Sequence, residues 1–298
     1  MANNSTSITD NAVFSMIQLS EAVVIVVMNA LGFSVFLSKT FRFKKSTYFL
    51  VNLTVADFMV GVTLIVLAAF PLVGLRRNEF YSICVKINFV SVGASVWSFT
   101  AIAIERTSAI LAPFKHRLLG NKPYVFGISL IWVIAILNDL PTITEIPSDI
   151  FLTIKNASGL AVPIFIVFCY LAIWVRVKFA KSIANARQHS DNKKLTMTLF
   201  LVTLASFLCY FPLAVASIYN TWVEPVNGGI FNGFMLLIYM NSLINFLLYS
   251  FRMPEFRKEL VKVLRKCLVR RIPTSEDFPI FRSCPQRARG VHSAWRGR

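Results

Sequence analysis

Seven long apolar runs, separated by short polar stretches, dominate the pattern of hydrophobic and polar positions along the chain. A membrane core about 30 Å thick is crossed by about 20 helical residues, and each run approaches or exceeds that length. The runs cover residues 14–38, 47–72, 81–111, 124–140, 160–179, 195–219 and 230–251. The pattern therefore predicts an all-α membrane protein, a seven-transmembrane helix bundle over residues 14–251 with no second soluble domain.

The segments on either side of this bundle have different patterns. Residues 1–13 contain no Lys or Arg, and the apolar run that follows is too long for the core of a signal peptide, so we expect a retained first span. Residues 252–267 alternate apolar and basic positions at helical spacing, which predicts a short amphipathic helix on the membrane surface. Residues 268–298, rich in Arg, Pro and Ser, are predicted to be a disordered tail.

The composition supports a membrane protein and excludes several other classes. Of 298 residues, 56% are hydrophobic and only 15% are charged, which is too apolar for a soluble globular domain. A net charge of +17 would suggest nucleic acid in a soluble chain, but here we expect loops that face anionic lipid and no nucleic-acid partner. With 27 Phe and only 12 Gly and 12 Pro, the chain is neither disordered nor collagen-like.

The basic residues predict the orientation in the membrane. They gather after the first, third and fifth spans and in the tail, whereas the other connections carry few. Because Lys and Arg concentrate on the cytoplasmic side, we expect the N-terminus outside and the C-terminus in the cytoplasm. Three N-x-S/T sequons fall on the outer side and are candidate glycosylation sites: Asn3, Asn4 and Asn156.

Polar and ionisable side chains recur inside the spans, where they are costly and therefore count as functional candidates. They form motifs at residues 52–57 of the second span, 105–113 at the end of the third and 241–249 at the end of the seventh. Further members of the set are Asn29, Trp132, Pro163 and the Cys-Tyr-Phe-Pro sequence at 209–212. Together these motifs resemble the rhodopsin-like (class A) family of G protein-coupled receptors over about residues 14–267, without pointing to one subfamily.

The resemblance implies a multi-pass receptor of the plasma membrane that is not an enzyme. Such a receptor binds an extracellular small molecule or peptide and activates a heterotrimeric G protein by outward movement of the cytoplasmic helix ends. No metal motif, Gly-rich phosphate loop or nucleophile–His pairing is evident in the sequence. A membrane transporter or channel without G protein coupling is the alternative, although no internal repeat supports it.

Glu105 and Arg106 are the candidate switch. An adjacent carboxylate can hold the guanidinium group until another partner competes for it, while the alternative is an interfacial Arg that extends to water. The resemblance adds Asn245 and Tyr249 to this switch. Residues 192–194, Asn-Lys-Lys, replace the acidic partner that some relatives use at the base of the sixth span, so we expect a weaker inactive-state lock and raised basal signalling.

Asp57 lies in the middle of the second span and needs polar partners. Oxygen ligands suit a hard cation, and the alternative is a hydrated polar network without an ion. No Lys occurs within 230–251, so retinal is not expected, and an allosteric sodium ion is the only cofactor that we predict. The resemblance supplies the sodium ligands: Asp57, Ser95, Asn241, Ser242 and Asn245.

The ligand pocket is predicted from positions that the family uses. Amine receptors of the family carry an Asp in the outer half of the third span, where this chain has Asn88, so a biogenic amine is disfavoured. Three acidic residues near the outer end of the fourth span, Asp139, Glu145 and Asp149, either attract a basic peptide or are solvated loop charges. The predicted pocket, for which ordinary packing is the alternative, comprises Asn88, Val92, Tyr210, Phe211, Ser217 and Tyr239.

Several positions depart from the family pattern. Phe246 stands where the seventh span usually has Pro, which puts the expected kink in doubt, and Tyr210 stands where the sixth usually has Trp. Cys84 has no cysteine on its side of the membrane to join, so no disulfide is predicted. Cys267, at the end of the amphipathic segment, resembles the family's palmitoylated cysteine.

Overall fold

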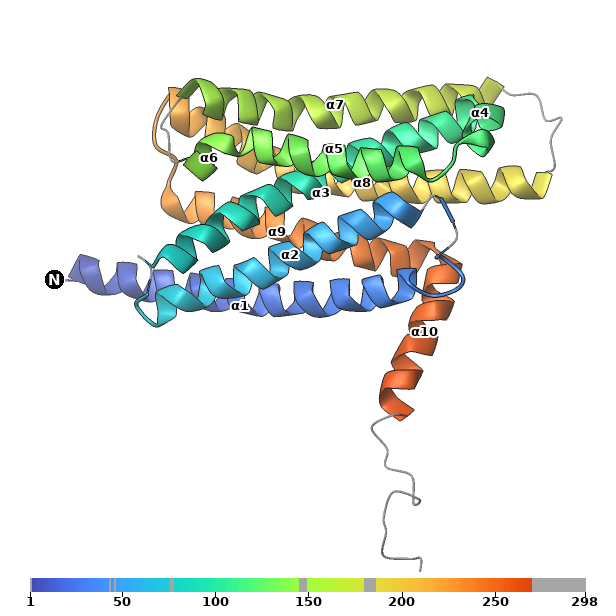
Figure 1. Cartoon of the computed structure of the whole chain (residues 1–298). Coiled ribbons are helices and arrows are strands. Elements are labelled where there is room, and N and C mark those ends of the chain that lie inside the picture. The colour runs from blue at the N-terminus through green and yellow to red at the C-terminus, as the bar shows by residue number, and fades with distance from the viewer. Residues whose placement is uncertain are drawn as a thin grey trace, which may run out of the picture.

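The computed structural model describes residues 2–42, 44–45, 47–75, 78–144, 149–179 and 186–269. This part of the chain is made of α-helices with turns between them, and the long helices run side by side as one bundle (Figure 1). The predicted fold class, an all-α helical bundle, is confirmed. The helices are α1 Ala2–Phe36, α2 Thr47–Leu72, α3 Glu79–Leu111, α4 Pro113–Leu118, α5 Lys122–Asn138, α6 Leu140–Thr144, α7 Asp149–Phe179, α8 Ala186–Trp222, α9 Gly228–Arg252 and α10 Pro254–Val269.

Seven of these helices correspond to the predicted spans. Six are long and apolar enough to cross a membrane: α1 from Ala12, α2, α3, α7 from Ala157, α8 from Leu204, and α9. The seventh, α5, has 17 residues, about 26 Å at 1.5 Å per residue, which lies at the short end of membrane-spanning helices. The helices α1, α7 and α8 begin before the predicted spans, because hydropathy marks the apolar part of a helix and not its polar extension.

Short polar signals set several helix ends. Asn78 precedes α3 and its Oδ1 accepts a hydrogen bond of 2.9 Å from the backbone N–H of Phe80. Asn227 accepts one of 2.9 Å from Gly229 at the start of α9. Such side-chain caps satisfy backbone donors that the first helical turn leaves unpaired. The turn after α2 contains Gly74 at φ 76°, a left-handed conformation that glycine adopts without strain.

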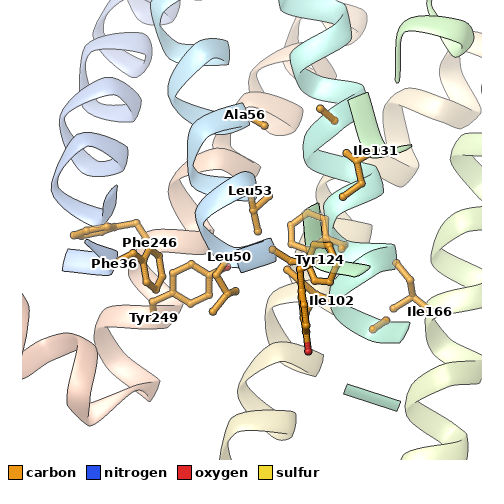
Figure 2. Close-up of a cluster of buried hydrophobic side chains, with 14 of the residues drawn as sticks. Phe36, Leu50, Leu53, Ala56, Ile102, Tyr124, Ile131, Ile166, Phe246 and Tyr249 are labelled. Atoms are coloured by element: carbon orange, nitrogen blue, oxygen red, sulfur yellow. The ribbon is translucent and has the colours of Figure 1, made fainter. Parts of the chain in front are cut away.

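The bundle core lies between α2, α3 and the helices around them. Helix α1 packs against α2 and α9, α2 packs against α3, and α3 packs against α5 and α7. Figure 2 shows apolar side chains of this core pointing toward one another from several helices, among them Leu53, Ile102 and Ile131. Other large apolar side chains, such as Phe126 and Phe168, are exposed, as expected for a bundle surrounded by lipid.

Helix α10 leaves the bundle where α9 ends (Figure 1) and is anchored there by aromatic packing. Phe256 is fully buried, with its ring centroid 5.2 Å from that of Phe36, 5.7 Å from Phe246 and 5.9 Å from Tyr249. Such ring pairs add stabilisation beyond the burial of area. Phe246, which replaces the expected Pro, therefore takes part in holding α10 against α1 and α9.

A polar contact fixes the same helix to the connection after α1. Thr40 Oγ1 donates a hydrogen bond of 2.9 Å to Glu259 Oε1, and Lys262 Nζ donates one of 2.8 Å. The bond from Lys262 and then that from Thr40 lower the pKa of Glu259, because both favour the charged carboxylate. The predicted tail lies outside the described residues from 270 onward.

Candidate functional site

Asp57 stands at the centre of a buried polar network that joins three helices. Its side chain on α2 is fully buried. Oδ1 accepts hydrogen bonds from Ser95 Oγ of α3 at 2.9 Å and Ser242 Oγ of α9 at 3.0 Å, while Oδ2 accepts one from Asn245 Nδ2 of α9 at 2.8 Å. A buried carboxylate is tolerated when its oxygens are hydrogen-bonded in this way. Ser95, Ser242 and Asn245 thus surround Asp57.

Two further amide oxygens bear on whether this network fits a cation. Asn241 Oδ1 and Asn245 Oδ1 are buried and have no hydrogen-bond partner in the described part of the chain. Serine hydroxyls can turn from donating toward Asp57 to offering their lone pairs. Asn241 makes no hydrogen bond to Asp57 among the described contacts, although it lies one turn from Asn245 on α9. The carboxylate, hydroxyl and amide oxygens form a donor set that suits a small hard cation.

The remaining polar motif residues tie neighbouring helices together. Asn29 Nδ2 of α1 donates to the backbone oxygen of Ser242 on α9 at 3.1 Å. Asn52 of α2 donates from Nδ2 to Ser98 Oγ of α3 at 2.9 Å and accepts a bond of 3.0 Å from Trp132 Nε1 of α5. These side chains are satisfied within the bundle, so their role is to hold the helices around the Asp57 network.

Glu105 and Arg106 form a buried ion pair at one end of α3. Arg106 donates from Nε and Nη2 to Glu105 Oε2, and the exposed fractions of the two side chains are only 8% and 5%. Arg106 therefore lies inside the bundle and does not extend to water. Its guanidinium group is held by the neighbouring carboxylate, the arrangement that a competing partner could open.

Two residues that the sequence reasoning missed complete this ion pair. His116 Nε2, on α4, lies 3.0 Å from Glu105 Oε1, and Tyr124 Oη, near the start of α5, lies 3.1 Å from the same His116 nitrogen. Nothing in the local sequence marks either residue, because their proximity arises from the fold of α4 back toward α3. Glu105 consequently contacts Arg106 through one oxygen and His116 through the other.

The structure separates the four predicted switch residues into different groups. Asn245 belongs to the Asp57 network, and Tyr249 packs between aromatic rings, 5.8 Å from the ring of Phe36. Among the described contacts, no hydrogen bond or ion pair links either residue to Arg106. The side chains of 192–194 lie outside the described residues, so the weaker lock expected from them stays a prediction.

A cavity of about 240 Å³ opens at the other end of the bundle, and it contains most of the predicted ligand pocket. Phe211 is the exception and corrects the prediction: it is 44% exposed and packs on Phe207, with ring centroids 5.2 Å apart. Successive residues of a helix differ in direction by about 100°, so Tyr210 can face the cavity only if Phe211 turns away. The predicted residues that do line the cavity are Asn88, Val92, Tyr210, Ser217 and Tyr239.

Asn88, the residue at the position of the amine-binding Asp, is already engaged within the protein. It is 2% exposed, and its Nδ2 donates to Thr63 Oγ1 of α2 at 2.9 Å. Its Oδ1 accepts a bond of 3.2 Å from the hydroxyl of Tyr239 on α9. Asn88 therefore links three helices at the floor of the cavity.

An ion pair forms another wall of the cavity. Asp139, directly after α5, accepts a hydrogen bond from Lys155 Nζ of α7, and both residues line the cavity. Asp139 is 2% exposed, so its interpretation as a solvated loop charge is wrong, whereas attraction of a basic peptide stays a prediction. Glu145 and the side chain of Asp149 lie outside the described residues.

Glu21 is a further carboxylate within a predicted span, in addition to Asp57, Glu105 and Asp139, and the sequence reasoning missed it. It lies on α1, and both of its carboxylate oxygens are buried without a hydrogen-bond partner in the described part of the chain. An acidic residue in the outer half of the first span belongs to no motif of the set above, which explains why motif reasoning did not single it out.

The predicted modification sites are largely untested. Cys84 is buried and its thiol is free. The helices include the sequon positions and Cys267, but these side chains lie outside the described residues: Asn3, Asn4, Asn156 and Cys267. Glycosylation and palmitoylation remain predictions.

Comparisons with known proteins agree with this geometry. The sequence model described as "7 transmembrane receptor (rhodopsin family)" matches residues 28–150 and 144–249. The melatonin receptor type 1A of Mus musculus is 30% identical over 277 residues, which cover 80% of this chain and 77% of that protein. The somatostatin receptor type 4 of Rattus norvegicus is 24% identical over 264 residues, an alignment that covers 78% of this chain and 68% of that protein. The melatonin receptor type 1B of Homo sapiens is 29% identical over 247 residues, an alignment that covers 72% of this chain and 68% of that protein.

Proposed function

Because the chain belongs to the rhodopsin-like family of seven-transmembrane, G protein-coupled receptors, we propose that it binds an extracellular ligand in the outer cavity and activates a heterotrimeric G protein. It is a multi-pass membrane receptor, and its relatives are receptors and not enzymes. The observation that carries the proposal is the buried Glu105–Arg106 pair, which lies at the end of α3 opposite the cavity.

The proposed mechanism is a population shift between two bundle arrangements. In the described arrangement, Glu105 holds Arg106 inside the bundle and is itself contacted by His116. Outward movement of the cytoplasmic helix ends would open space beside α3. Arg106, once released, would present five N–H donors to an acceptor surface of the G protein. A ligand favours this state only to the extent that it binds that state more tightly.

The distribution of charge supports the orientation that this mechanism needs. Helix α4 contains Lys115 and Arg117, and α10 contains a further series of bases. Both helices lie at the same end of the bundle, opposite the N-terminus (Figure 1). Since bases accumulate on the cytoplasmic side, we assign this end to the cytoplasm of the plasma membrane and the cavity to the outside.

We extend the proposal to a sodium ion bound at Asp57. Ser95, Ser242, Asn241 and Asn245 would contribute oxygen ligands, and the ion would supply a positive charge that balances the buried carboxylate. The buried amide oxygens without partners support this assignment. In this role Asp57 and its partners couple α2, α3 and α9, so binding of the ion would favour the arrangement in which these helices are close together.

The test is a ligand panel applied to cells that express the chain with a G protein dissociation reporter. Melatonin and somatostatin belong in the panel, because the relatives named above are receptors for them. We expect one ligand class to dissociate the G protein in wild type and not in Arg106→Gln at equal surface level. Ligand-dependent flux or current in a reconstituted bilayer without G protein would instead support a transporter or channel, which the receptor relatives do not favour.

A further inference from the structure

The lining of the outer cavity is largely apolar and aromatic, and two of its polar side chains are already bonded within the protein. Asn88 and Tyr239 bond to each other, and Asn88 also bonds to Thr63. A ligand that used these two side chains would have to break those bonds, at the cost of leaving buried polar groups unpaired. The apolar part of the lining includes Val92, Leu213, Phe231, Met235 and Ile238.

Lys155 differs from these groups because it lines the cavity as the more exposed partner of an ion pair. Its side chain is 24% exposed, compared with 3% for Asp139, so a ligand in the cavity has better access to Lys155 than to the carboxylate. The position of Asp139 has a local cause at Gly93 on α3. A Cβ atom there would lie 3.3 Å from Asp139 Oδ2, so the missing side chain leaves the space in which the carboxylate is seated.

The surroundings of the ammonium leave donor capacity toward the cavity. A lysine ammonium has three N–H donors. Lys155 gives one to Asp139, and its Nζ lies 4.5 Å from the centroid of the Phe89 ring, a cation–π distance. Among the described residues that line the cavity, Lys155 is the one cationic side chain. An oxygen acceptor that enters the cavity can therefore bind this ammonium without breaking the pair.

We propose that this cavity selects an amphipathic ligand with an aromatic or apolar body and an oxygen acceptor, a carboxylate or a carbonyl, that binds Lys155. Asp139 acts as a positioning residue that keeps the ammonium at the cavity wall. A cationic amine is rejected, because it meets the ammonium of Lys155, while Asp139, the one carboxylate among the described residues that line the cavity, is already paired. This inference rests on the proposed role of the cavity in ligand binding and defines the chemistry of that ligand.

Three probes that share one body test the proposal: 3-phenylpropionate, 3-phenylpropionamide and 3-phenylpropylamine. Binding is measured by saturation-transfer NMR on the full-length receptor in nanodiscs, without G protein. We expect the carboxylate and the amide to bind and the amine to bind at least about tenfold more weakly, the ratio expected when one charge-assisted hydrogen bond is lost. Asp139→Asn keeps an oxygen acceptor that can position Lys155 but removes the negative charge that repels a second carboxylate, so it should strengthen carboxylate binding more than amide binding.

Variants of Lys155 locate the contact. Lys155→Met should weaken carboxylate binding about tenfold or more, and Lys155→Arg should retain it. Lys155→Met leaves Asp139 as an unpaired buried charge, which can prevent folding. The double variant Lys155→Met with Asp139→Asn removes both charges, and we expect the same loss of carboxylate binding from it. Lys86→Met is the matched control, because Lys86 lies on α3 but not among the residues that line the cavity.

Three results would overturn the proposal. They are equal or tighter binding of the amine, undiminished carboxylate binding by Lys155→Met alone or combined with Asp139→Asn, and binding by neither acceptor probe up to its solubility limit. The assay contains no G protein, so its failure leaves the coupling proposal standing. Conversely, loss of signalling in Arg106→Gln tests coupling and does not depend on the chemistry at Lys155.

Discussion

Replacing Glu105 with glutamine should raise ligand-independent signalling. Glu105 contacts two groups, the guanidinium of Arg106 and the ring of His116, and its side chain is only 5% exposed. A hydrogen bond to a charged group contributes about 1.5–3 kcal/mol, and a neutral one about 0.5–1.5 kcal/mol. Glutamine keeps the shape but has no charge and one acceptor oxygen in place of two, so the contact with Arg106 is no longer an ion pair and that with His116 loses its carboxylate, a weakening of about 1 kcal/mol each. A total of about 2 kcal/mol shifts the equilibrium toward released Arg106 by up to about thirtyfold.

The assay is basal G protein dissociation, normalised to receptor at the cell surface. Glu255→Gln is the matched control, because Glu255 is also paired, with Lys44, but its side chain is 58% exposed. Exposed pairs contribute little, so this variant should signal at the wild-type basal level. His116→Ala removes one of the two contacts and should give an intermediate increase. Basal output of Glu105→Gln equal to wild type at the same surface level would refute the reasoning.

Three other substitutions test separate parts of the structure. Arg106→Gln should bind ligand as wild type does but lose G protein activation, measured by ligand binding and a dissociation reporter on the same cells; normal signalling would rule out the proposed switch. Asp57→Asn should be expressed and should abolish the effect of sodium on agonist affinity, whereas a wild type without sodium dependence would remove the ion from the network. Phe256→Ala should destabilise the docked α10 by about 3–5 kcal/mol, seen as a lower thermal midpoint of the purified receptor. Val261→Ala, at a position 42% exposed on the same helix, should change that midpoint little, and an equal loss in both variants would contradict the aromatic anchoring.

Hydropathy predicted the membrane-spanning parts of the helices because apolar length is the dominant requirement of a bilayer. The predicted second span, 47–72, coincides with α2. Hydropathy could not predict that α7 begins at Asp149, well before residue 160, where the predicted span begins. That first part of the helix contains polar residues, and a hydropathy profile cannot distinguish a helix that continues into water from a loop.

The polar contacts were predictable where a motif marked both partners. Asp57 and Ser242 each stood out as polar residues within a span, and the structure joins them directly. His116 carried no such mark, because the position of the short helix α4 determines what it contacts. Asp139 was marked as an acidic residue, but nothing in the sequence marked its partner Lys155. Phe211 shows a different limit: the motif placed it correctly on α8, but only the rotation of the helix decides which of two adjacent aromatic residues faces the cavity.

At the end of the bundle that contains the cavity, an ion pair joins two helices, and the described residues there form no disulfide. Lys155 and Asp139 connect α7 to the end of α5, while the thiol of Cys84 on α3 is free. Noncovalent links form wherever the helices meet and do not need an oxidising compartment. The receptor should therefore assemble when it is synthesised in a reducing cell-free extract directly into lipid nanodiscs. Reducing agents could then be present from synthesis to measurement without opening the receptor's ligand cavity.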